Sequence, residues 1–187
     1  LPIWFDEVVS KALFFGLPVW LYVKMGAGKK LLSSMSIEKI KPGLLLGLAL
    51  GGLYGFAVIV MLAARQGATV VPTPYFLEPL FWGHFWLAMV TGFWERLFFY
   101  VWIMGVIREK HQGWSMWRQM GVAVAIFTVF HIPNAFLQLP TMGAMRLVLL
   151  LAVFGAGQAL ILYQRKNAYA LMISQALWGL VLLVHLS

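Results

Sequence analysis

Residues 81–106 read FWGHFWLAMVTGFWERLFFYVWIMGV, and this run decides the fold. A helix needs about 20 apolar residues to cross roughly 30 Å of hydrocarbon, and this run is long enough. It contains one adjacent pair of charged residues, Glu95 and Arg96, near its middle. The sequence therefore predicts a transmembrane helix that carries two charged side chains at membrane depth.

Five further apolar runs lie along the chain, and together they predict an all-α bundle of about six transmembrane helices in a single domain, 1–187. The first of them is the weakest, because it contains Lys11 and Pro18. A tilted or interfacial helix is the alternative there. The five further runs are residues 8–23, 44–63, 121–138, 147–163 and 168–186.

The composition excludes a water-soluble domain. Of the 187 residues, 62% are hydrophobic and 11% charged, and the mean hydropathy is +0.86. Such a chain has too little polar surface for a disordered or nucleic-acid-binding protein, and without cysteine it cannot be a disulfide scaffold. The lipid bilayer is the predicted partner, together with other membrane protein subunits and without nucleic acid.

The net charge of +8 has a topological explanation. Most lysines and arginines lie in the connections after the first, third and fifth predicted spans, whereas Lys11, Arg65 and Arg146 lie toward the opposite side. The positive-inside rule predicts that the basic loops are cytoplasmic, so both termini lie on the opposite side. The same cations are suited to contact anionic lipids.

Small residues mark one face of the second span. Gly47, Gly51 and Gly55 recur at four-residue spacing. This double small-xxx-small pattern predicts that the helix backbone packs closely against a neighbouring helix.

Three polar residues on different spans are predicted to lie at similar depth. Glu95 lies 13 residues before the nearest basic connection, His131 lies 13 after one, and Gln175 lies nine after another. At about 1.5 Å per residue, the first two share a layer and the third is a turn away. Pro133 lacks a backbone donor and frees the carbonyl of Val129 beside this layer.

A carboxyl and an imidazole in contact are the minimum for general acid-base activation of water. Glu95 and His131 are therefore the candidate catalytic residues, with Gln175 and Asn134 as polar neighbours. The alternative is a hydrogen-bonded cluster that only fixes the helix register. Glu95 and Arg96 project about 100° apart and are not expected to pair.

No metal site is predicted, because the layer offers one histidine and one carboxylate whereas zinc catalysis commonly uses three protein ligands. His84 and His185 lie near the ends of their spans. Interfacial histidines are the simpler interpretation. The alternative is an axial ligand to a haem or chlorophyll-type cofactor.

The order of motifs resembles the CPBP (Abi, CAAX-protease and bacteriocin-processing) family of intramembrane endopeptidases. Phe127 and His131 fit the family motif F-x-x-x-H, and the chain continues to Asn134 as the family does. Residues 154–178 are similar to the family's glycine-containing helix and its last motif helix. The resemblance covers about residues 81–182 and implies a CPBP-like helical core.

The first motif of that family, E-E-x-x-x-R, is incomplete in this chain. In one register Trp94 replaces the first glutamate, Glu95 is the second, and Phe99 replaces the arginine. In the other register Glu95 is the first glutamate, but Arg96 replaces the second and Tyr100 the arginine. Neither register restores the motif.

The last motif, H-x-x-x-N, is lost: Gln175 stands for the histidine and Gly179 for the asparagine. The resemblance implies that the glutamate and histidines activate water while the asparagine helps to hold the oxyanion. Only Glu95 and His131 remain of that set, so we expect a catalytically impaired protein that serves as a binding or structural subunit.

Two other functions stay open at this stage. The first is an active endopeptidase that uses Glu95 and His131, with Gln175 as a hydrogen-bond donor. The second is a subunit that contacts a pigment or haem through His84 or His185.

Overall fold

The computed structural model describes residues 4–26, 28–66 and 79–186 and, within them, all side chains except those of residues 30, 58–59, 61–66, 138 and 181–186. Every regular element in these ranges is helical, which confirms the all-α prediction. The chain begins with one helical stretch made of η1 (Phe5–Ser10), η2 (Ala12–Gly16) and α1 (Leu17–Lys24), where η1 and η2 are π-helical.

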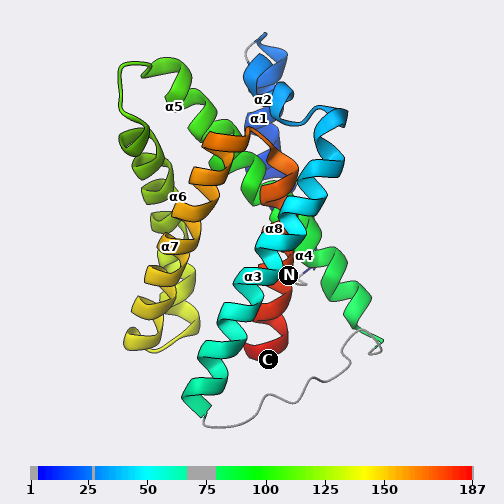
Figure 1. Ribbon diagram of the computed structural model, residues 1–187, viewed down its shortest axis with the longest axis vertical. Helices are drawn as coiled ribbons and strands as arrows, with labels where there is room; N and C mark the ends of the chain where they lie inside the picture. Colours follow the sequence, from blue (N-terminus) through cyan, green and yellow to red (C-terminus); the bar gives the residue numbers. More distant parts are fainter. Residues whose placement is uncertain (1–3, 27, 67–78, 187) are drawn as a thin grey trace.

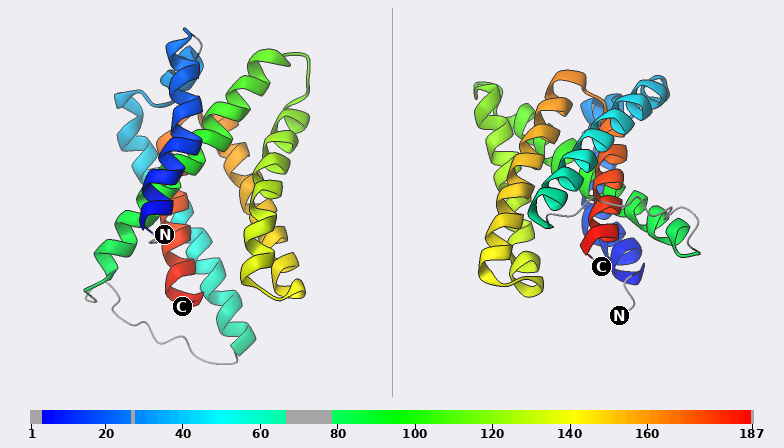
Figure 2. Two further views of the ribbon diagram at one scale, coloured as in Figure 1. Left: turned by 180° about the vertical axis from the view of Figure 1, so that it is seen from behind. Right: turned by 60° about the horizontal axis from the view of Figure 1, so that its bottom comes forward.

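The remaining helices pack into a helical bundle (Figure 1). Three consecutive elements, α4, the π-helical stretch η5 and α5, form one continuous helix. In the views of Figures 1 and 2, α6 lies beside α7, and α3 lies beside α8. The elements are α2 (Lys29–Ser34), η3 (Ile37–Lys39), α3 (Ile40–Gln66), α4 (Phe81–Arg96), η5 (Leu97–Met104), α5 (Gly105–Lys110), α6 (Met116–Gln138), α7 (Thr141–Arg165) and α8 (Ala168–Leu186).

Four helices of the described chain are long and apolar enough to cross a membrane. The protein is therefore a multi-pass integral membrane protein. The first and the sixth predicted spans are not among the four. The first helical stretch carries charges, and the described apolar part of α8 is shorter. That these two segments cross the membrane stays a prediction. The four spans are Leu31–Ala57, Phe81–Lys110, Met116–Leu137 and Thr141–Arg165.

The glycine stripe of α3 packs directly on α8, as its spacing predicts. A Cβ added at Gly47 would lie 2.6 Å from Ile173 Cβ, and one at Gly51 would lie 2.6 Å from Leu177 Cδ1. Neither position has room for a side chain without a shift of α8. The close approach fixes α8, and with it Gln175, relative to the rest of the bundle.

The connection between α7 and α8 is two residues long. Lys166 ends α7 in the left-handed conformation, with φ of 50°. Asn167 then caps α8, because its side-chain oxygen accepts hydrogen bonds from the backbone N–H groups of Tyr169 (3.0 Å) and Ala170 (3.4 Å). The Asn167 amide donates to the Lys39 carbonyl at 2.9 Å, which ties this corner to the start of α3.

Candidate functional site

Glu95 lies in the last turn of α4 and is the centre of a buried polar cluster. Only 7% of its surface is exposed. The Lys11 ammonium donates to its Oε1 at 2.9 Å, and the Gln175 amide donates to its Oε2 at 3.2 Å. His131 Nε2 lies 3.9 Å from the same Oε2. The structure thus brings together the three residues that depth counting predicted, while their catalytic roles stay predictions.

His131 is held by its own helix. Its Nδ1 lies 2.8 Å from the carbonyl oxygen of Phe127, and because a carbonyl only accepts, Nδ1 carries the hydrogen. Nε2 then faces Glu95 at a distance too long for a hydrogen bond. Pro133 lies inside α6, one turn after Val129 whose carbonyl it is predicted to free, and the imidazole itself meets the Phe127 carbonyl. Asn134 is exposed on α6.

The sequence reasoning missed the contribution of the first helical stretch to this cluster. Lys11 Nζ lies 2.5 Å from Glu7 Oε2 as well as contacting Glu95. The Thr91 hydroxyl of α4 also donates to Glu7. The signal was present in the spacing, because Glu7 and Lys11 are four residues apart and so lie on one helix face. We call Glu7, Lys11, Thr91, Glu95 and Gln175 the Glu95 cluster.

Arg96 is fully buried and is accommodated mainly by aromatic rings. Its guanidinium carbon lies 4.9 Å from the ring centroid of Tyr100, 4.7 Å from that of Phe127 and 5.4 Å from that of Phe154. None of its nitrogens donates a hydrogen bond to a described residue. These three rings, contributed by η5, α6 and α7, form what we call the Arg96 cage.

The expectation that Glu95 and Arg96 would not pair was wrong. Arg96 Nη2 lies 3.8 Å from Glu95 Oε2. The backbone directions of adjacent residues do diverge by about 100°, yet the long arginine side chain reaches back across that angle. Two carboxylates, Glu7 and Glu95, and two cations, Lys11 and Arg96, therefore lie in one connected region whose charges balance, as an apolar bundle requires.

The donor set around Glu95 does not fit a catalytic metal ion. Among the described residues, no group of three or more histidine, cysteine or carboxylate side chains is placed to hold one. The nearest neighbour of the carboxylate is the Lys11 ammonium, a cation that competes with a metal for the same oxygens. We derive no catalytic step through a metal at this position.

His84 and His185, for which axial ligation was the alternative to an interfacial position, are not part of this cluster. His84 is exposed in the first turn of α4. His185 belongs to α8, but its side chain lies outside the described residues. A haem or chlorophyll-type ligand at either position stays a prediction.

The fold and the site together define a class, a multi-pass helical membrane protein with a carboxylate, an imidazole and an amide in contact inside the bundle. Within that class, residues 77–181, more than half of the chain, match the family model described as type II CAAX prenyl endopeptidase Rce1-like. The chain belongs to this family. No curated protein and no solved structure gives a significant match to it.

The residues that the resemblance assigns to the family's motifs lie close together in the structure. His131 of α6 and Gln175 of α8 both lie beside the Glu95 carboxylate of α4, at 3.9 Å and 3.2 Å from its Oε2. The position of the motif asparagine, Gly179, carries no polar group, and a Cβ there would lie 3.9 Å from Ala88 Cβ. The resemblance thus leaves Glu95 and His131 of the motif residues in contact range, with an amide at Gln175 and no polar group at Gly179.

Proposed function

We propose that this protein is a CAAX endopeptidase-like membrane protein that has lost hydrolytic activity and acts as a binding or structural subunit of a membrane assembly. The observation that carries the proposal is the ion pair between Lys11 Nζ and Glu95 Oε1, at 2.9 Å. A cation from the first helical stretch thereby occupies the carboxylate oxygen that a water molecule would need.

The chemistry of the neighbours supports the same conclusion. Glu95 Oε2 accepts from the Gln175 amide, so both carboxylate oxygens are engaged. An amide polarises an oxygen but does not exchange protons at neutral pH, so Gln175 cannot replace a histidine as an acid or a base. Removal of a single oxyanion donor costs an enzyme about 100-fold or more in rate, and this chain has glycine at the asparagine position.

A cleavage assay tests the loss of activity. The purified full-length protein is incubated with a prenylated CAAX peptide and with a membrane-anchored peptide, beside an active family member as positive control. We expect no hydrolysis above background, because water has no free base at Glu95. The variants Glu95→Ala and His131→Ala are expected to show the same background hydrolysis as the unmodified protein, and so is His84→Ala, the matched control at an exposed histidine away from Glu95.

Hydrolysis that disappears in Glu95→Ala and His131→Ala but persists in His84→Ala would overturn the proposal. That result would favour an endopeptidase that works with Glu95 and His131, whose Nε2 already faces the carboxylate. The subunit role is tested separately, by native mass spectrometry of protein extracted from its own membranes. A stoichiometric membrane partner is expected, and a protein that is always alone would contradict this role.

The topology is part of the same proposal, with the basic connections in the cytoplasm and both termini on the other side. Because the chain has no cysteine, single cysteines introduced at Gln112 and Thr141 report the two faces without background labelling. An impermeant thiol reagent applied from outside should label Thr141→Cys only. Labelling of Gln112→Cys alone would invert the topology.

A further inference from the structure

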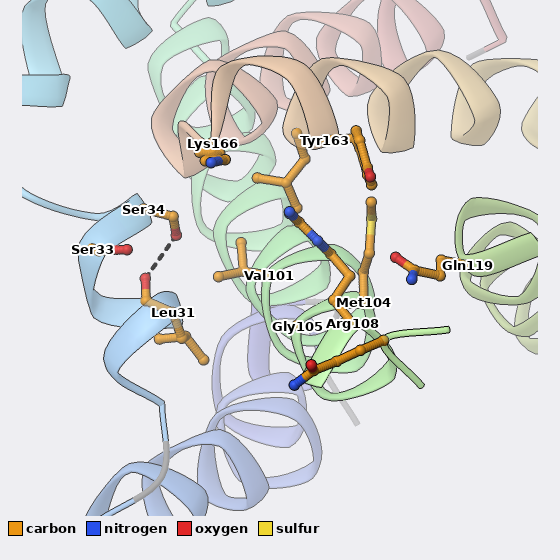
Figure 3. Close-up of a pocket in the computed structure, with 12 residues that line it drawn as sticks. Leu31, Ser33, Ser34, Val101, Met104, Gly105, Arg108, Gln119, Tyr163 and Lys166 are labelled. Atoms are coloured by element: carbon orange, nitrogen blue, oxygen red, sulfur yellow. Dashed lines mark hydrogen bonds between the residues drawn. The ribbon is translucent and has the colours of Figure 1, made fainter. Parts of the chain in front are cut away.

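A pocket of about 460 Å³ lies at the end of the bundle that carries most of the basic connections. Figure 3 shows side chains from α2, η5, α5, α6 and α7 around it. Its lining contains no member of the Glu95 cluster and no ring of the Arg96 cage. The pocket is therefore separate from the family site, and an inference about it does not rest on the proposed function.

The pocket is cationic and is lined without a carboxylate. Arg108 of α5 and Lys166 at the end of α7 both line it, beside neutral polar groups such as Ser34 and Gln119. The Arg108 guanidinium carbon lies 4.6 Å from the centroid of the Tyr163 ring, and the side chain makes no hydrogen bond or ion pair with another described residue. Its donors are thus left for a ligand.

The backbone carbonyls at this end are already satisfied by another cation. The Lys39 ammonium donates to the Ser33 carbonyl at 2.7 Å and to the Lys166 carbonyl at 2.8 Å. Carbonyls at helix ends carry partial negative charge and attract nearby cations. Because Lys39 takes that role, Arg108 and the Lys166 ammonium are available to an anion.

One wall of the pocket is apolar and adjoins a separate apolar groove. Val101, Met104 and Leu162 line the pocket, and Leu31 lines both this pocket and a groove of about 480 Å³ between the first helical stretch, α2 and α4. The groove is lined almost entirely by apolar side chains, including Trp20. A charged site and an apolar groove that share a wall residue match a ligand with an anionic head and a hydrocarbon tail.

We propose that this pocket binds the phosphate of an anionic phospholipid, held by Arg108 and Lys166, with an acyl chain of the same lipid in the groove beyond Leu31. Guanidinium groups bind phosphate oxygens through paired hydrogen bonds, and basic pockets between membrane helices bind anionic headgroups. A lipid at this place would also join α2, α5 and α7, which contribute the pocket walls.

Native mass spectrometry of the purified full-length protein tests the site. Phosphatidylglycerol and phosphatidylcholine with identical acyl chains are titrated, so that only the headgroup charge differs. Each cation near an anionic headgroup contributes about fivefold in affinity. We expect phosphatidylglycerol to bind at least about fivefold more tightly, and Arg108→Gln and Lys166→Gln each to remove about that factor.

The controls separate a specific site from general charge. Arg118→Gln is the matched control, because Arg118 also lies over an aromatic ring, 4.1 Å from the Trp114 centroid, but does not line the pocket. We expect it to change the affinity less than twofold, and Arg108→Lys to retain most of the binding. Unchanged melting of Arg108→Gln and Lys166→Gln shows that both variants are folded, and equal losses in Arg118→Gln would overturn the proposal.

Inorganic phosphate and glycerol phosphate separate the lipid from a soluble ligand. We expect both to bind much more weakly than phosphatidylglycerol, because neither fills the groove at Leu31. Binding of inorganic phosphate as tight as that of the lipid would overturn the lipid assignment.

Discussion

Glu95 and Arg96 are neighbours on α4, yet the molecule accommodates their charges in two different regions. The Glu95 cluster, toward the first helical stretch and α8, is built from hydrogen bonds and ion pairs. The Arg96 cage, toward α6 and α7, is built from three aromatic rings, and its guanidinium donates no hydrogen bond within the described part of the chain. The two regions meet where Arg96 Nη2 lies 3.8 Å from Glu95 Oε2 and where the Phe127 ring packs on His131, with ring centroids 4.3 Å apart.

The difference follows from the chemistry of each ion. A carboxylate concentrates its charge on two oxygens and needs donors within hydrogen-bond distance when it is buried. A guanidinium spreads its charge over a plane and is more weakly hydrated, so ring faces replace part of its solvation. We therefore expect that single substitutions disturb the Glu95 cluster more than the Arg96 cage.

The largest expected effect is that of Glu95→Ala. It leaves Lys11 and Arg96 with one counter-ion, Glu7, and removal of one partner of a buried ion pair costs about 3 kcal/mol or more. Thermal unfolding of the purified protein in detergent measures the loss. The matched control is Glu109→Ala, an exposed carboxylate on the same continuous helix that accepts a hydrogen bond from the Tyr22 hydroxyl. A melting shift as large as that of Glu95→Ala in this control would contradict the role of burial.

A smaller effect is expected from filling the cage with one methyl group. In Gly155→Ala the new Cβ would lie 2.6 Å from the Tyr100 hydroxyl oxygen and 3.1 Å from Phe127 Cδ1. Overpacking of this kind costs about 2 kcal/mol, which exceeds the gain in helix propensity. Gly179→Ala is the control, because its Cβ would meet only Ala88, at an ordinary 3.9 Å. Equal melting temperatures of Gly155→Ala and Gly179→Ala would mean that the Arg96 cage is not tightly packed.

The smallest effect is expected from Arg96→Met, which replaces the guanidinium by an apolar side chain of similar length. The cation–π contacts are lost, but the cost of burying a charge without hydrogen bonds is lost as well. Lys11 is then shared by Glu7 and Glu95, but the lost contact with Arg96 was 3.8 Å long and no hydrogen bond, so we expect the free energy of unfolding to change by about 1 kcal/mol. A loss comparable with that of Glu95→Ala would mean that Arg96 is needed as a counter-ion of Glu95.

The sequence predicted those features that depend on spacing along a helix. The four-residue spacing of Gly47 and Gly51 predicted a close contact, which the structure places against α8. Counting residues from the basic connections predicted Glu95 and His131 in one layer with Gln175 a turn away, because the rise of a helix is constant. Both predictions need only helix geometry.

The features that the sequence did not predict depend on which helices are neighbours. Lys11 reaches Glu95 across 84 positions of sequence, and no local pattern shows that the first helical stretch packs against α4. The sequence predicts the cations at the basic end to be topology signals and contacts for anionic lipids, but it does not show that Arg108 and Lys166 line one pocket. The sequence also did not predict that η5 is π-helical, with backbone hydrogen bonds between residues five apart instead of four.

The π-helical stretch η5 determines the rotation of α5 about the helix axis relative to α4. Arg96 directly precedes η5, and Arg108 lies in α5, which follows it. Because a residue of a π-helix contributes somewhat less rotation than the roughly 100° of an α-helix, deletion of one residue from η5 would turn α5 by about a quarter turn relative to α4. Arg108 would then leave Tyr163 while Glu95 kept its neighbours. The π-helical turns of η5 therefore determine how Arg108 at the basic end is oriented relative to the buried charges of α4.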